Sequence, residues 1–173
     1  HAAGTLSCQR DSQTTHSYFI NVAGLAYDAW LVKQIEDNPS SKGHALIYLW
    51  SILRNLLTYR PQQGEVTCGD RFWSGRFYTL NAGICPYSGG GMRVVPHADP
   101  AHHKLALTIA GDLPLSRILW NIWRFYTGSI GRVKEVDTLQ ATQLHVESRD
   151  PDPFYIEADG EWKGQCPCSI GII

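Results

Sequence analysis

Short segments rich in β-branched and aromatic residues, separated by turn residues, recur along this chain and most constrain its fold. A strand is predicted at residues 17–22, and a hairpin at residues 65–68 and 73–80 around the Gly69-Asp70 turn. Because the strands do not alternate with helices, we expect a mainly β domain, either a sandwich or a distorted barrel. Further strands are predicted at residues 104–110, 132–136, 141–147, 153–158 and 164–172.

Two to three amphipathic helices are expected beside the strands. Leucines and a tryptophan recur at three- and four-residue spacing in residues 46–57, and Pro61 stops this pattern. A second helix is predicted at residues 115–126, ended by Gly128. A shorter helix is predicted at residues 28–37.

Composition narrows the class of protein. The 173 residues suit one domain, and an apolar fraction of 43% excludes a disordered chain. A net charge of -1 argues against a broad nucleic-acid-binding surface. No apolar run reaches the roughly 18 residues that span a bilayer. The five cysteines are expected to be reduced thiols of a cytoplasmic protein rather than a disulfide framework.

The sequence lacks a phosphate-binding loop and the common hydrolase motifs, so candidate chemistry rests on local features. Asp159 and Glu161 flank Gly160 after an apolar segment. One carboxylate of such a pair can bind Mg²⁺ and the other can accept a proton from an attacking hydroxyl. The alternative is a solvated hairpin turn, because Asp-Gly is common turn chemistry.

A glycine-rich stretch is the second feature. Gly89, Gly90, Gly91 and Met92 follow the Asn81 segment, and consecutive glycines allow a backbone to approach a ligand closely. A plain flexible loop is the alternative reading. These five residues are therefore candidate substrate-binding positions.

Two polar residues near the first predicted helix are the third feature. Asn21 and Asp28 lie where a strand turns into a helix, and both can hydrogen-bond a polar substrate head. They can equally serve as cap and turn residues.

Three histidines lie close to an aspartate, which makes a metal site conceivable. These residues are His97, Asp99, His102 and His103. Adjacent histidines on a strand point to opposite faces, so joint ligation is awkward and a solvated turn is the favoured interpretation.

Taken in order, these features resemble the C-terminal domain of diacylglycerol-kinase and sphingosine-kinase-like lipid kinases, especially the bacterial soluble branch. The resemblance extends from about Ser17 to Ile173. It is carried by the ordered set of residues 19–24, Asp28-Ala29, an amphipathic helix, residues 81–83, residues 89–92, Pro96 and residues 159–161.

This resemblance implies a distorted two-sheet β-sandwich over residues 17–173, with residues 1–16 as a tag remnant or a linker from a missing N-terminal domain. That N-terminal α/β domain carries the loop that holds the ATP phosphates, so ATP and Mg²⁺ would bind mainly there. The chain alone is then expected to be inactive. The competing hypothesis is a non-catalytic β-sandwich that binds lipid or a protein partner.

The resemblance also implies residue roles. Asp159 and Glu161 match the pair that supplies the proton acceptor and contacts nucleotide and Mg²⁺, with Asp159 as the metal ligand. Asp28 matches an acidic position that contacts the lipid head group in the sphingosine-kinase branch. The expected reaction is attack of a lipid hydroxyl, such as that of a diacylglycerol-like lipid, on the γ-phosphoryl of ATP.

One departure from the family pattern concerns an accessory metal site. His102 and His103 occupy positions where the family commonly has Asp-Gly, whose aspartate holds a structural Mg²⁺. Imidazole is a poor Mg²⁺ ligand, so we predict that this site is absent or altered.

Tryptophans and arginines on the predicted helices suggest two roles. Trp50, Trp120 and Trp123, with Arg117 and Arg124, are able to seat the domain transiently at a membrane surface. Packing of the tryptophans against the sheet is the favoured alternative. A cytoplasmic protein with a peripheral membrane contact is therefore expected.

Overall fold

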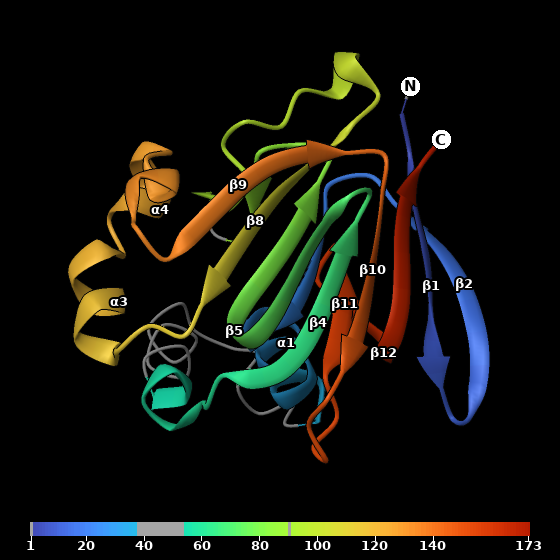
Figure 1. Ribbon diagram of the computed structural model, residues 1–173, viewed down its shortest axis with the longest axis horizontal. Coiled ribbons are helices and arrows are strands. Elements are labelled where there is room, and N and C mark those ends of the chain that lie inside the picture. Colours follow the sequence, from blue (N-terminus) through green and yellow to red (C-terminus); the bar gives the residue numbers. More distant parts are fainter. Residues whose placement is uncertain (1, 38–53, 90) are drawn as a thin grey trace.

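The computed structural model describes residues 2–37, 54–89 and 91–173, and these residues are mainly β, as expected (Figure 1). Within them, a ten-stranded antiparallel sheet dominates, and a small second sheet pairs β6 (Tyr87–Ser88) with β7 (Met92–Arg93). The large sheet comprises β1 (Gly4–Arg10), β2 (Gln13–Phe19), β3 (Val22–Ala26), β4 (Gln62–Cys68), β5 (Arg71–Gly83), β8 (Leu105–Gly111), β9 (Val136–Ala141), β10 (Gln143–Ser148), β11 (Tyr155–Ala158) and β12 (Glu161–Ile172).

Six strands close into a barrel-like sheet in the order β10-β4-β5-β3-β11-β12, because β10 also pairs with β12. The two-sheet sandwich expected from the sequence is thus replaced by a closed arrangement, which was the alternative. Because the ring is closed, each of these six strands pairs with a neighbouring strand on both sides. The barrel is extended by β8 and β9 beside β5, and by β1 and β2 beside β12.

The expectation that residues 1–16 form a tag remnant or linker needs correction, because residues 4–19 form β1 and β2. Leu6 and Cys8 alternate with more exposed neighbours and are each 1% exposed, as in a strand with one face on a core. The turn residues Asp11 and Ser12 have φ angles of 50° and 65°, which fits a type I′ hairpin. The first strand pairs with the last, so both chain ends lie together (Figure 1).

The helices α1 (Tyr27–Asp37), α3 (Leu115–Asn121) and α4 (Arg124–Thr127) contribute to the site, as does Leu56 of the helical residues 54–58. The expected helix at residues 115–126 is present but breaks between α3 and α4, and Gly128 ends it with a φ of 70°, as predicted. None of the helices among the described residues is both long and apolar enough to cross a bilayer.

Two other predictions need comment. Residues 54–58 are helical, but the rest of the helix predicted at residues 46–57, with Trp50, lies outside the described residues. The strand predicted at residues 132–136 is wrong, because a 3-10 turn (Ile130–Arg132) precedes β9, which begins at Val136. Val133, a β-branched residue that favours strands, is instead buried directly after this turn. Strand propensity alone therefore predicted the wrong structure here.

The core has two main parts. One fills the barrel, with Phe19, Leu80, Leu107 and Ile156 among its buried members. The other lies where the helices meet the sheet and includes Tyr27, Leu31, Tyr78, Leu113 and Ile130. All five cysteines are free thiols, four of them buried. The second core surrounds the candidate site.

Candidate functional site

A cavity of about 650 Å³ lies between the sheet and the helices, within the range typical of small-molecule sites. Side chains from α1, β5, β8, α3, α4 and the β11–β12 turn line it. Most of these side chains are apolar, so the cavity suits an apolar ligand segment. Apolar members include Leu31, Ile35, Val94, Leu113, Ile118 and Phe125.

A polar cluster interrupts this apolar lining. Asp28 lies in the first turn of α1, directly after β3, and its carboxylate accepts hydrogen bonds from Thr79 Oγ1 and, at 2.9 Å, from Asn81 Nδ2. Thr79 and Asn81 are two residues apart on β5, so they share one face of the strand. Burial raises the pKa of Asp28, while the bonds from Thr79 and Asn81 oppose that rise.

A fourth polar residue has an unused hydrogen-bonding group. Thr108 on β8 is the register partner of Asn81 and lines the same cavity. Thr108 Oγ1 is buried and finds no partner among the described residues. A buried unpaired hydroxyl costs about 1–3 kcal/mol, so a ligand that hydrogen-bonds it would recover that energy.

Glu157 is a buried carboxyl that the sequence analysis did not identify. It is 3% exposed on β11, and its Oε2 accepts the Gly160 N–H at 2.8 Å. Gly24 on β3 leaves room for it, because a Cβ there would lie 2.6 Å from Glu157 Oε1. The pKa of Glu157 is raised to about 8, mainly by burial and also by the nearby Asp28 and Asp159, while the hydrogen bond from the Gly160 N–H opposes the rise.

Glu157 should therefore make stability fall with rising pH. The folded chain holds this proton up to about pH 8 and the unfolded chain loses it near the ordinary value of 4.5, so stability is lost across that window. We expect Glu157→Gln to be more stable than the wild type by on the order of 2–4 kcal/mol above about pH 8 and nearly equal below about pH 4.5. Urea unfolding at several pH values measures this difference.

The control for that experiment is Glu147→Gln, which changes a half-exposed carboxyl of β10. It should leave the pH dependence as it is in the wild type. A Glu157→Gln difference that stays constant with pH would contradict a proton held by Glu157.

Asp159 occupies the two-residue turn between β11 and β12, where it and Gly160 have φ angles of 52° and 82°. The hairpin-turn alternative is therefore correct about its local geometry. Its carboxylate nevertheless reaches back to the β2–β3 connection and accepts the N–H groups of Ile20, Asn21 and Val22 at 2.8, 2.9 and 3.2 Å. This fixes the turn against the Asn21 segment at the edge of the cavity.

Glu161, the first residue of β12, is placed differently. Its side chain is 73% exposed at the rim of the cavity and accepts a hydrogen bond from Lys163 Nζ at 2.6 Å. The Lys163 ammonium lowers the pKa of Glu161, so this carboxyl is ionised at neutral pH. Asp159 is held in place, whereas Glu161 is accessible.

The structure brings most of the predicted substrate-binding residues to one place. Asn21, Asp28, Asn81, Gly89 and Met92 all line the cavity. Gly91 lies in the connection from β6 to β7 with a φ of 80° and is not among the lining residues, and Gly90 lies outside the described residues. Sequence positions far apart are thus joined around one cavity.

The fit of Mg²⁺ depends on the free oxygens of the carboxylate hairpin. Asp159 Oδ2 accepts one backbone N–H and keeps a lone pair, and Glu161 is exposed beside it. Mg²⁺ usually takes one or two protein carboxylates together with phosphates and water, so the pair fits that requirement. Within the described ranges, no group of three or more potential ligands surrounds a common point.

The histidine segment forms a short 3-10 turn (Pro100–His102). His102 Nδ1 lies 3.0 Å from Asp99 Oδ2, and its side chain is 66% exposed. His97 Nε2 lies 2.9 Å from the carbonyl oxygen of Leu139 instead. The histidines are thus in different environments, and the altered accessory metal site stays a prediction.

Comparison with known proteins shows the family of this chain. Residues 21–173 match the family described as the YegS C-terminal NAD kinase beta sandwich-like domain, and the chain belongs to that family. This confirms the resemblance to C-terminal domains of diacylglycerol-kinase-like lipid kinases.

Individual proteins similar to this chain carry names consistent with that family. The chain is 25% identical over 159 residues to the Bacillus subtilis (strain 168) protein named "Putative lipid kinase YtlR", covering 87% of this chain and 50% of that protein. Its fold is similar to a structure named as a putative diacylglycerol kinase from Bacillus anthracis str. Sterne, with a TM-score of 0.63, 15% identity and coverage of 100% of this chain and 54% of that one. The chain therefore spans about half the length of these relatives.

A structure of yeast NADH kinase complexed with NADH is also similar in fold, with a TM-score of 0.50 and 9% identity. It covers 99% of this chain and 39% of the yeast chain. Together the comparisons define a kinase-family domain.

Proposed function

We propose that this chain is the substrate-binding half of an ATP-dependent lipid kinase, whose parent transfers the γ-phosphoryl group to the hydroxyl of a diacylglycerol-like or related lipid. The observation that carries the proposal is the mainly apolar cavity with buried polar residues and the Asp159–Glu161 hairpin at its edge. An amphipathic lipid alcohol has the matching chemistry, an apolar chain and a polar reacting end.

In this proposal the acyl chain occupies the apolar part of the cavity and the head group meets the polar cluster. Thr108 Oγ1 and the Asp28 carboxyl are the groups available to bind it. Exclusion of water by the walls strengthens each of these polar contacts. The bound hydroxyl then lies toward the rim, where the hairpin carboxylates are.

The two carboxylates have different tasks. Glu161 is exposed and ionised, so it accepts the proton of the attacking hydroxyl as the new O–P bond forms, while the bond between the γ-phosphorus and the bridging oxygen breaks and ADP leaves. Asp159, with three backbone N–H donors, orients the hairpin and would hold Mg²⁺ through its remaining oxygen lone pair. When bound, ATP would supply the phosphoryl group and Mg²⁺ would neutralise part of its charge.

The rest of the machinery is assigned to the N-terminal domain of the same parent chain. The sequence contains no phosphate-binding loop, so we propose that ATP is held mainly by that domain and that the isolated chain does not turn over. A cytoplasmic location with transient membrane contact belongs to the same proposal, since the substrate resides in a bilayer.

The test is a phosphorylation screen with the full-length parent and ATP labelled on its γ-phosphate. The panel comprises diacylglycerol, monoacylglycerol, ceramide, a sphingoid base and phosphatidylglycerol, each also offered to the 173-residue chain. We expect label in at least one lipid with the parent and in none with the chain alone. Absence of labelled lipid with the parent would favour the non-catalytic binding module, and turnover by the chain alone would refute the assignment of ATP binding to the other domain.

A further inference from the structure

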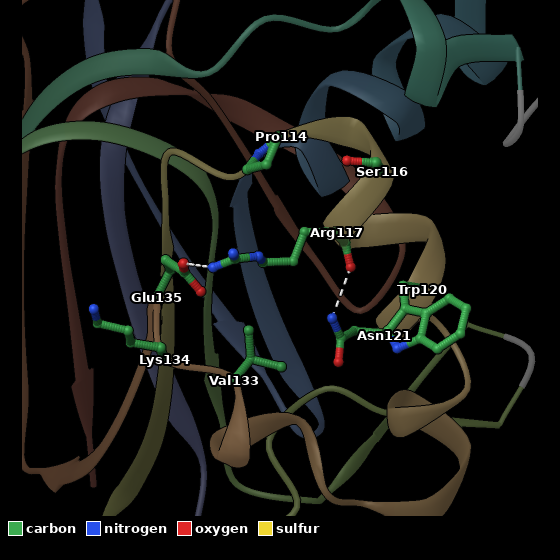
Figure 2. A pocket seen from close by; sticks show the side chains of 8 residues that line it. All are labelled: Pro114, Ser116, Arg117, Trp120, Asn121, Val133, Lys134 and Glu135. Carbon is green, nitrogen blue, oxygen red and sulfur yellow. Dashed lines mark hydrogen bonds and ion pairs between the residues drawn. The ribbon is translucent and has the colours of Figure 1, made fainter.

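A polar groove of about 460 Å³ beside α3 contains an exposed tryptophan and an ion pair. Trp120 and Trp123 are 81% and 50% exposed, so the expected packing of these two tryptophans against the sheet is wrong. Figure 2 shows Arg117 reaching across the groove to Glu135, with which it forms the ion pair. These two charges are thus paired with each other, whereas a row of polar side chains on the other side of the molecule ends in a serine hydroxyl.

This polar row lies on the outer face of β10 and β12. Leu144 and Val146 of β10 and Ile170 of β12 are at most 1% exposed and belong to the core of the barrel. Because neighbouring residues of a strand point to opposite faces, His145 and Ser169 point outward, and the two residues are register partners. Figure 1 shows β10 and β12 on the side of the molecule away from α3 and α4. The row is therefore separate from both the cavity and the groove.

Ser169, His145, Glu147 and Arg149 form a continuous series of polar contacts, which we call the serine relay. Ser169 Oγ lies 2.9 Å from His145 Nδ1. The other ring nitrogen, His145 Nε2, lies 3.4 Å from Glu147 Oε1. Glu147 Oε2 in turn lies 3.1 Å from a guanidinium nitrogen of Arg149. Arg149 therefore holds one oxygen of the carboxylate whose other oxygen faces the imidazole.

The order of these contacts assigns the protons of the relay. An ionised carboxylate only accepts hydrogen bonds, so Glu147 favours a hydrogen on the Nε2 that faces it. In the neutral imidazole Nδ1 then carries a lone pair and accepts the hydroxyl hydrogen of Ser169. A hydroxyl, an imidazole and a carboxylate in this order activate a serine as a nucleophile. The side chains of His145 and Glu147 are each 43% exposed, so a reactant has access to the relay.

A further hydroxyl lies beside the nucleophile. Ser7 on β1 is the register partner of Ser169, and its neighbours Leu6 and Cys8 are buried, so Ser7 points outward as well. Opposed residues of antiparallel strands have Cβ atoms about 4.5–5.5 Å apart. The Ser7 hydroxyl is therefore placed to donate to the oxygen of a carbonyl group that Ser169 attacks, where a donor stabilises the developing negative charge.

We propose that the serine relay is a second active site, at which Ser169 hydrolyses esters of small acyl groups. Ser169 Oγ bonds to the carbonyl carbon of the ester while His145 Nδ1 takes the hydroxyl proton. The bond between this carbon and the alcohol oxygen then breaks, and the alcohol leaves with that proton. Water attacks the acyl-serine by the same route, which releases the carboxylic acid and restores the hydroxyl. Glu147 and Arg149 are positioning residues for the imidazole. The inference goes beyond the proposed function and does not depend on it.

The experiment treats the 173-residue chain with p-nitrophenyl acetate and, separately, with an alkyl fluorophosphonate. We expect repeated release of p-nitrophenol, and an acetyl or phosphonyl group on Ser169 in residue-level mass spectrometry. Ser169→Ala should abolish the adduct, and His145→Gln should slow its formation at least tenfold, because no base then takes the hydroxyl proton. Both variants change side chains outside the core, so their urea unfolding should match the wild type and exclude misfolding as the cause.

Two matched controls separate the relay from general surface reactivity. Ser74→Ala removes an exposed serine of β5, and His103→Gln removes an exposed histidine after the 3-10 turn, both outside the relay. Both variants should form the Ser169 adduct at the wild-type rate. An adduct that forms elsewhere than on Ser169, or that forms at the wild-type rate in His145→Gln, would overturn the proposal.

Glu147→Gln tests the positioning role of the carboxylate. Without the negative charge the imidazole no longer favours a hydrogen on Nε2, so formation of the Ser169 adduct should slow at least tenfold. Nitrogen NMR of His145 should show the hydrogen moving from Nε2 toward Nδ1, which loss of a merely structural contact would not cause. An unchanged tautomer with an unchanged rate would refute the relay.

The assay contains neither ATP nor a lipid alcohol, so its result is independent of the proposed function. Glu161→Gln, which changes the carboxylate hairpin, should form the Ser169 adduct as the wild type does. Loss of the adduct in that variant would contradict a relay that acts separately from the cavity.

Discussion

Replacing Glu161 by glutamine in the full-length parent should lower phosphoryl transfer to the lipid by about 100- to 10,000-fold, the range that a general base contributes. Glutamine preserves the size of the side chain but cannot take the hydroxyl proton. Because Glu161 is 73% exposed, its replacement should change the free energy of unfolding by less than about 0.5 kcal/mol. Initial rates with γ-labelled ATP and urea unfolding measure the two effects.

The matched control is Glu65→Gln in the same parent. Glu65 on β4 is also an ion-paired surface carboxylate, bound to Arg149 at 2.7 Å, and lies outside the cavity lining. It should keep the wild-type rate. If Glu161→Gln retained full activity, the hairpin would be only a turn.

Filling the cavity should produce the second largest effect. Ala110 on β8 is 6% exposed and lines the cavity, so Ala110→Phe places an aromatic ring where we assign the acyl chain. Displacing two or three methylenes costs about 0.8 kcal/mol each, which lowers kcat/KM for a long-chain lipid alcohol by about 10- to 100-fold. A short, water-soluble alcohol of the same head group should be affected less than about threefold.

Ala101→Phe serves as the control, because Ala101 lies exposed in the 3-10 turn outside the cavity. It should change the rate with neither alcohol. Equal losses with long and short alcohols in Ala110→Phe would indicate general disruption of the domain and contradict an acyl chain in this cavity.

Local patterns in the sequence predicted the elements better than their assembly. The hairpin of β4 and β5 and the helix end at Gly128 follow from turn and cap chemistry that acts over a few residues. Barrel closure depends on pairing of β10 with both β4 and β12, and no local pattern reports such long-range pairing. The strand predicted at residues 17–22 covers only the end of β2 and the first residue of β3, and β1 was not predicted. The start of β2 is polar, so its stability depends on pairing with β1, which no local pattern reports.

The candidate site was predicted in part for similar reasons. Asp28 and Asn81, more than fifty residues apart, were both predicted as substrate-binding residues on separate grounds, and the fold brings them within hydrogen-bonding distance. The sequence analysis did not identify Glu157 and Thr108, because each lies inside an apolar strand. A polar residue in such a strand is usually interpreted as facing the solvent.

The central claim is that a lipid alcohol occupies the cavity beside the carboxylate hairpin. The most direct measurement is photo-crosslinking of the chain with a long-chain lipid alcohol that carries a diazirine in its acyl chain, followed by residue-level mass spectrometry. We predict labels on the lining residues Met92, Ile118 and Phe125 that disappear in Ala110→Phe. Labels confined to β1 and β2, or unchanged by Ala110→Phe, would contradict the account.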